Sequence, residues 1–136
     1  PYTSSAASDV YKRQIKMLNS GEGGQMIFEP AVIKVSVGDT IHFKATDAAH
    51  NSVSVDGMVP VGASSWASQL SQDISITLDT EGVYVYQCDP HLIMAMVGVI
   101  QVGEAVNMDE IKSAASSYSS NFLMNNDRLQ SYLSQL

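Results

Sequence analysis

Between residues 15 and 102, short segments of alternating apolar and polar residues recur between turns, and this spacing limits the possible folds most. The alternation is clearest in ISITL (74–78) and VYVYQC (83–88), where successive side chains would point to opposite faces of a strand. SGEGG, VGD and DTEG are turn sequences between such segments. This pattern is typical of a mainly β chain forming a β-sandwich of about eight strands. The expected strands are residues 15–18, 25–28, 32–37, 40–45, 52–55, 73–78, 82–87 and 97–102.

The periodicity becomes helical after Gly103. Asn107, followed by Glu110, resembles a capping box at the start of a first helix. A second helix is expected around residues 126–135. The predicted apolar faces comprise Ile111, Ala114, Ala115 and Tyr118 in the first helix and Leu129, Tyr132, Leu133 and Leu136 in the second. Two such helices cannot form a domain alone, so we expect them to pack on the sandwich.

A chain of 136 residues is expected to form one domain. Residues 1–14 are interpreted as a non-native or disordered tail, because DVYKRQ (9–14) resembles a translated sequencing adapter. The domain then spans residues 15–136, with the sandwich in 15–103 and the helices in 104–136. A net charge of −7 argues against a nucleic-acid partner, and no apolar run is long enough for a membrane span.

The stretch CDPHLIMAM (88–96) contains the only cysteine, so the chain has no intrachain disulfide. Cys88 ends a predicted strand, and His91 is close enough in sequence for a loop to direct both side chains at one atom. Met94 and Met96 offer two candidate thioethers. One thiolate, two imidazoles and a weak thioether bond suit copper that cycles between its two oxidation states, whereas structural zinc sites more often use several cysteines.

The second imidazole must come from elsewhere in the chain. His50 lies at the end of a loop that enters a strand, where its ring can be presented at one pole of the sandwich. His42 alternates with Ile41 and Phe43, so it is either a cross-strand surface residue or a hydrogen-bonded core histidine. His50 is therefore the better candidate ligand.

Two other interpretations of the loop are less favourable. Cys88 and His91 could form a nucleophile and its base, but nothing supplies the remaining catalytic framework, so we expect no enzyme. A buried thiol near a histidine by chance is disfavoured because the same loop also carries a suitably spaced methionine.

Several motifs together resemble pseudoazurins, which are type 1 blue copper proteins with the Greek-key β-sandwich of the cupredoxin fold. They are MLNSGEGGQMIFEPAVIKVSVGDTIHF, AHNSVSV, GVYVYQCDPH and MVGVIQVG, and the resemblance runs from residue 15 through both helices. It implies a plastocyanin-like domain holding one copper ion. By position, the implied ligands are His50, Cys88, His91 and axial Met96.

The resemblance also implies roles beyond the ligands. Asn51 would tie the two ligand loops together and Pro90 would stiffen the approach to His91. The implied function is single-electron transfer by a monomer in the bacterial periplasm, to partners such as copper nitrite reductase or a cytochrome. A copper-binding or delivery protein without a redox partner is the alternative, although a thiolate with two imidazoles favours a retained ion.

The chain departs from the family at several positions. Asp89 replaces a usual threonine and would favour Cu(II), and Ile93 and Ala95 replace glycines and would stiffen the loop. The lysines that surround the exposed histidine in pseudoazurins are largely missing. We therefore expect an apolar docking face with weak electrostatic steering, formed by Met26, Leu92, Ile93 and Met94.

The choice of thioether depends on the residues C-terminal to it. Met94 gives the cysteine-histidine-methionine spacing of amicyanin, and Met96 gives that of plastocyanin and pseudoazurin. Because MVGVIQVG enters the last strand as it does in pseudoazurins, Met96 is the predicted axial ligand.

Overall fold

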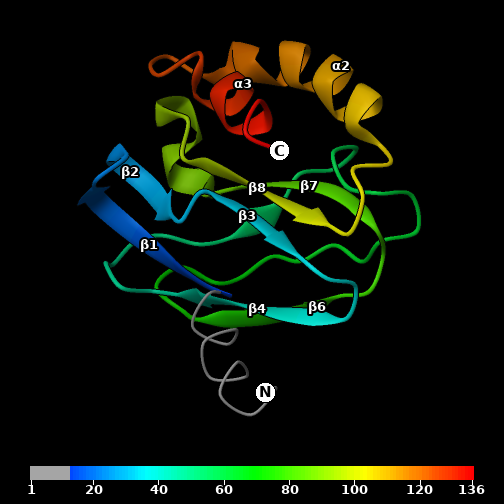
Figure 1. Cartoon of the computed structure of the whole chain (residues 1–136). Helices are drawn as coiled ribbons and strands as arrows, with labels where there is room; N and C mark the ends of the chain where they lie inside the picture. Colours follow the sequence, from blue (N-terminus) through cyan, green and yellow to red (C-terminus); the bar gives the residue numbers. More distant parts are fainter. Residues whose placement is uncertain (1–12) are drawn as a thin grey trace.

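The computed structural model describes residues 13–136, and this part of the chain forms two stacked four-stranded sheets (Figure 1). One sheet has the order β2-β1-β4-β6 and the other β3-β8-β7-β5. Each contains one parallel pair, β1 with β4 and β3 with β8. The predicted β-sandwich with C-terminal helices is confirmed. The strands are β1 (Gln14–Gly21), β2 (Gly24–Glu29), β3 (Val32–Val35), β4 (Asp39–Lys44), β5 (Val53–Ser54), β6 (Ile74–Leu78), β7 (Gly82–Gln87) and β8 (Val97–Val102).

The first strand begins inside the segment that was expected to be a tail. Gln14 pairs with His42 of β4, and Arg13 forms an ion pair with Asp39 at 3.3 Å. Both residues are therefore bonded to β4: Gln14 pairs with it, and the Arg13 carbonyl accepts a hydrogen bond from the His42 N–H. The rest of the predicted tail, residues 1–12, lies outside the described part of the chain.

Aromatic side chains fill the space between the two sheets. Phe28, Phe43 and Tyr86 meet edge to face, with ring centroids 4.7 to 6.1 Å apart. Trp66 comes from the connection between β5 and β6 and joins this cluster with 8% of its surface exposed. Such close packing is sensitive to volume. A Cβ at Gly98 would overlap the hydroxyl of Tyr86, its cross-strand neighbour, so this position admits only glycine.

The C-terminal helices cover the sheet that contains β7 and β8 (Figure 1). They are α2 (Met108–Tyr118) and α3 (Arg128–Leu133), with the short helix η2 (Ser119–Asn121) between them. Their predicted apolar faces are confirmed, since all eight residues are buried or pack partly buried against the second core cluster. No helix in residues 13–136 is long and apolar enough to cross a membrane.

The predicted capping box at the start of α2 is wrong. Asn107 makes no side-chain cap to the helix. Instead its Oδ1 accepts a hydrogen bond from the Val83 N–H at 2.7 Å, and its Nδ2 donates to the Val83 carbonyl at 3.0 Å. Strand β5 is too short to pair with β7 at Val83, so the Asn107 amide satisfies this open edge and joins the helical layer to the sheet.

Candidate metal centre

Three predicted ligands converge at one end of the sandwich. Cys88 directly follows β7, His91 lies in the 3-10 helix η1 (Asp89–Met94), and His50 lies in the loop between β4 and β5. The Cys88 Sγ is 3.6 Å from His50 Nδ1 and 3.4 Å from His91 Nδ1. The three potential ligand atoms all lie within 4.8 Å of one another, which is close enough to bind a single metal ion.

The backbone of the loop explains why Cys88 and His91 share one site. Helix η1 begins immediately after Cys88, and Pro90 occupies its first turn, where a missing N–H costs no hydrogen bond. The His91 N–H donates to the Cys88 carbonyl at 3.2 Å, and the Cys88 N–H donates to the Met96 carbonyl at 3.0 Å. The loop is thus closed across its base between β7 and β8.

His50 is fully buried and is oriented by a residue that the sequence analysis missed. Its Nε2 lies 2.7 Å from Asn19 Oδ1, which can only accept, so Nε2 carries the proton and Nδ1 directs its lone pair at the centre. Burial first, and then the charge of His91, lower the pKa of His50, against the opposing effect of Asp47. The lowered pKa favours the neutral ring, which is the form in which an imidazole binds a metal ion.

Cys88 is also fully buried. Burial raises the pKa of its thiol, and the backbone N–H groups of Asn51 and His91 oppose this shift. The nearby charge of Asp89 adds to the rise in pKa. The raised pKa favours the protonated thiol, and a bound metal ion would favour the thiolate instead.

Asn51 connects the loop of His50 to that of Cys88. Its Oδ1 accepts a hydrogen bond from the Asp89 N–H at 2.8 Å, and its Nδ2 lies 3.3 Å from both Asp89 Oδ2 and the Ser68 carbonyl. The Asp89 carboxylate also accepts a bond from Gln87 Nε2 at 2.9 Å, and Gln87 in turn accepts one from the Tyr118 hydroxyl. The exposed carboxylate is therefore fixed beside the centre by two amides.

The two methionines of the loop differ in their surroundings. Met96 is fully buried and belongs to the same core cluster as Cys88. Its N–H donates to the His91 carbonyl at 3.2 Å, so its backbone is tied to both neighbouring ligands. Met94 is half-buried at the end of η1. These positions favour Met96 over Met94 as the thioether donor of the centre.

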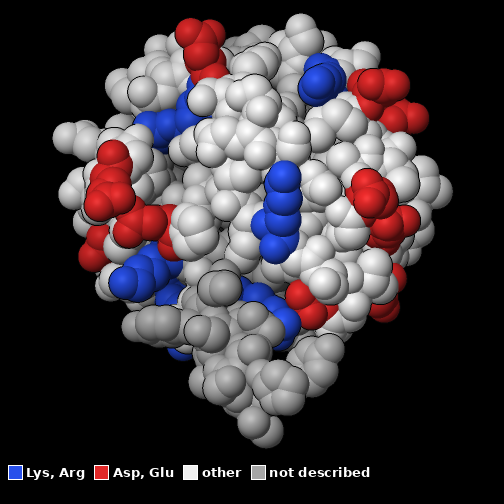
Figure 2. Space-filling model, in the orientation of Figure 1, with Lys and Arg blue, Asp and Glu red and all other residues white. Residues whose placement is uncertain are grey.

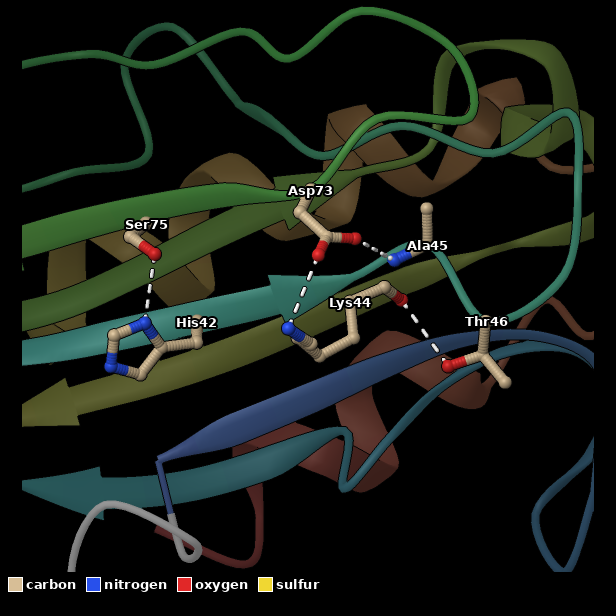
Figure 3. Close-up of polar contacts among 6 residues, drawn as sticks. All are labelled: His42, Lys44, Ala45, Thr46, Asp73 and Ser75. Carbon is tan, nitrogen blue, oxygen red and sulfur yellow. Dashed lines mark hydrogen bonds and ion pairs between the residues drawn. The ribbon is translucent and has the colours of Figure 1, made fainter.

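His42 lies away from the centre, on β4. Its Nδ1 is 2.8 Å from Ser75 Oγ on β6, directly across the pair (Figure 3). Of the two predicted alternatives, His42 is thus the half-buried cross-strand residue. The same edge carries Asp73, which accepts hydrogen bonds from the Ala45 N–H at 2.7 Å and from Lys44 at 3.1 Å (Figure 3).

Comparison with known proteins shows which family the chain is similar to. Residues 15–103 match the sequence model of copper-binding proteins of the plastocyanin/azurin family. The chain belongs to this family. It is 41% identical over 102 residues to a pseudoazurin of Methylorubrum extorquens, covering 75% of this chain and 68% of that one. The pseudoazurin of Paracoccus pantotrophus is 40% identical, with 74% and 70% covered.

Solved structures agree with the sequence matches. The pseudoazurin of Hyphomicrobium denitrificans superimposes with a TM-score of 0.78 at 32% identity, covering 90% of this chain and 96% of that one. The pseudoazurin of Methylobacterium extorquens gives a TM-score of 0.72 at 42% identity, with 74% and 82% covered. The predicted resemblance to pseudoazurins is confirmed.

The donors suit the copper ion that this family holds. A buried thiol with two imidazole nitrogens facing it is a soft and borderline donor set, and carboxylates, which hard cations prefer, are not among the converging atoms. The ring of His50 supports the same conclusion, because its Nε2 donates to Asn19 and its Nδ1 faces the Cys88 sulfur. Copper is thus the cofactor that this family and this geometry indicate.

Proposed function

We propose that the chain is a mononuclear type 1 copper protein that carries single electrons, with His50, Cys88, His91 and axial Met96 as its ligands. The observation that carries the proposal is the buried Cys88 sulfur, with imidazole Nδ1 atoms at 3.6 and 3.4 Å. A bound copper ion supplies one-electron redox chemistry through its Cu(II) and Cu(I) states.

The protein residues would keep the centre similar in both oxidation states. Thiolate and thioether suit Cu(I), and imidazoles suit both states. The hydrogen bond from His50 to Asn19 and the loop bonds of Asn51 hold the donors in place, so little has to move when an electron arrives or leaves. We propose that the centre transfers electrons between other proteins and does not itself catalyse a reaction.

His91 is the proposed route for electrons. It is half-buried, whereas His50, Cys88 and Met96 are fully buried, so its ring comes nearest to the surface. A partner that docks over His91 would therefore have the shortest path to the centre.

We propose an apolar docking surface beside His91, called here the loop patch. Ile93 is 51% exposed, and the predicted Met26, Leu92 and Met94 are half-buried. The patch extends to Leu123 and Met124, which are 77% and 48% exposed and whose N–H groups donate to the Ile93 carbonyl. The loop patch thus comprises Met26, Leu92, Ile93, Met94, Leu123 and Met124.

The charge distribution supports apolar rather than basic docking. From residue 15 onward the chain has five basic and thirteen acidic residues. On the face in Figure 2, basic and acidic side chains are dispersed, and the described residues there form no continuous basic patch. We propose transient encounters of a monomer with a copper nitrite reductase or a cytochrome in the periplasm, with weak steering by charge.

Adding Cu(II) to the purified apo-protein tests the centre. The expected product is blue or green, from intense thiolate-to-copper charge transfer. Cys88→Ala should abolish the colour, and Ser36→Ala, at a turn outside the centre, should keep it. A colourless wild-type product would refute the proposal.

Stopped-flow oxidation by a copper nitrite reductase tests the loop patch. Ile93→Ser should slow the second-order rate by about fivefold, the equivalent of roughly 1 kcal/mol of lost apolar contact. Val61→Ser is the matched control, because Val61 is 100% exposed outside the patch. Equal rates for both variants, or a steep fall of the rate with added salt, would contradict apolar docking.

A further inference from the structure

Arg128 of α3 is bonded to backbone carbonyls from two distant segments. Its Nη1 donates to Met26 at 3.0 Å, Ala95 at 3.2 Å and Met94 at 3.3 Å, and its Nη2 donates to Gln25 at 3.3 Å. Within residues 13–136, no carboxylate lies within ion-pair distance of this half-buried guanidinium. The charge is therefore used to bind carbonyl dipoles of the β1–β2 hairpin and the ligand loop.

In both segments, Arg128 binds carbonyls at positions where the regular hydrogen bonding of the helix or strand is interrupted. Ala95 ends η1 in the left-handed conformation, with φ 59° and ψ 40°, and the last carbonyls of a helix have no partner inside it. Met26 has φ 52° and interrupts the ladder between the pairs Leu18–Ile27 and Ser20–Gln25. Arg128 donates hydrogen bonds to the carbonyls at both irregular positions. A residue other than glycine costs energy in the left-handed conformation, and surrounding contacts such as these keep it there.

These two segments hold the groups that fix the centre. Met96 directly follows Ala95, and its backbone is bonded to both Cys88 and His91. On the hairpin, Asn19 lies in the same interval as Met26, between the pairs Leu18–Ile27 and Ser20–Gln25, and orients His50. A single guanidinium thus links the support of the proposed axial ligand to the support of a buried imidazole.

We infer that Arg128 is a positioning residue for the metal centre: its clamp on Met94, Ala95 and Met26 sets the position of the Met96 thioether. The inference rests on the proposed ligand set. A thioether would be the weakest of the four proposed donors, so the protein frame would set its position more than a bound ion would. Releasing the clamp should therefore alter the centre without removing a ligand.

Three variants and one control separate this role from general stability. Arg128→Gln removes the positive charge and shortens the side chain. Arg128→Lys keeps the charge but loses the planar guanidinium with its several N–H donors. Asn125→Gly removes a second donor to the Met94 carbonyl, at 3.2 Å, and tolerates the φ of 56° at that exposed position. Lys112→Gln, on the exposed face of α2, removes the same charge from the helical layer.

The first measurements are the visible spectrum and reduction potential of the copper-loaded proteins. Arg128→Gln should change the ratio of the charge-transfer bands and shift the potential. Arg128→Lys should give an intermediate change, Asn125→Gly a smaller one of the same sign, and Lys112→Gln none. Spectra and potentials identical to wild type in every variant that folds would overturn the inference. Arg128→Lys and Asn125→Gly keep the test decisive if Arg128→Gln does not fold.

The second measurement is amide hydrogen exchange in the apo-proteins, which needs no copper. Releasing the clamp should speed exchange at the Met96 N–H by about tenfold, and leave that of Ile100, in the middle of β8, unchanged. Equal exchange at Met96 in wild type and variants would contradict the clamp. A colourless wild type would instead refute the proposed copper site, so the two failures are distinguishable.

Discussion

Replacing Asn51 by aspartate should weaken the connection between the two ligand loops by a predictable amount. Asn51 Oδ1 accepts from the Asp89 N–H at 2.8 Å, and a carboxylate can still accept that bond. The Nδ2 atom, however, lies 3.3 Å from Asp89 Oδ2 and from the Ser68 carbonyl. Asn51→Asp turns this donor into a negative oxygen that faces two acceptors.

The cost follows from these contacts. Two carboxylates about 4 Å apart repel by about 1 kcal/mol in water and about 4 kcal/mol at the effective dielectric constant of a protein surface. Asp89 is exposed, so about 2 kcal/mol is appropriate for the charge repulsion. Loss of two long hydrogen bonds adds about 1 kcal/mol. The apo-protein should therefore lose about 3 kcal/mol of unfolding free energy, or roughly 10 °C in Tm.

Urea unfolding of the apo-protein measures this change without involving copper. Asn51→Asp combined with Asp89→Asn should recover most of the loss, because the amide at position 89 can then donate to the carboxylate at position 51. High salt should reduce the loss in the single variant, since the exposed charge of Asp89 is screened. Gln130→Glu, at an exposed position of α3, adds an equal charge and should change stability by less than about 0.5 kcal/mol.

Two results would refute this reasoning. One is a single Asn51→Asp variant as stable as wild type at low salt. The other is a double variant no more stable than the single one, which would mean that Asn51 and Asp89 do not interact across the loops.

Three further predictions concern other parts of the molecule. The hydrogen bond from the Ala45 N–H and the contact with Lys44 lower the pKa of Asp73 (Figure 3). Wild type should therefore exceed Asp73→Asn in unfolding free energy near pH 7. That difference should vanish as pH falls through the lowered pKa of the folded state, and a constant difference down to about pH 2 would contradict it. Leu129→Ala, at a fully buried position, should cost about 2–5 kcal/mol in urea unfolding, against under about 0.5 kcal/mol for exposed Leu123→Ala. Asn19→Ala should weaken copper binding by about 10–100-fold in a competition assay, because His50 loses its orienting partner, and unchanged affinity would exclude that role.

The strands were predictable where side-chain pattern and backbone pairing agree. The expected strands 82–87 and 97–102 match β7 and β8 residue for residue. β5 begins one residue later than the expected 52–55 because the Ser52 N–H donates to the Ser68 hydroxyl instead of joining a ladder. Asn107 was misjudged for a similar reason, since an amide that fits a capping box fits an open strand edge equally well.

In the candidate centre, the candidate ligands could be predicted from the sequence, and some of the residues that support them could not. Cys88 and His91 lie in one loop, so their convergence could be predicted from spacing, and His50 could be selected by its position before a strand. Asn19 could not be found, since nothing in its neighbourhood distinguishes it from other polar residues near turns. Arg128 contacts the hairpin across 102 residues of sequence and gave no local signal.

By itself, the sequence determined the sandwich, the helical faces and the loop that offers a thiol, an imidazole and thioethers. Each depends on periodicity or spacing within about ten residues, where the chain geometry leaves few alternatives. Tertiary structure alone decided that Asn19 faces His50, that Arg128 binds the ligand loop and that Asp89 is held by Gln87 and Asn51. These contacts depend on how sheets and helices pack, because a polar side chain takes whichever partner the packed fold brings within hydrogen-bond distance.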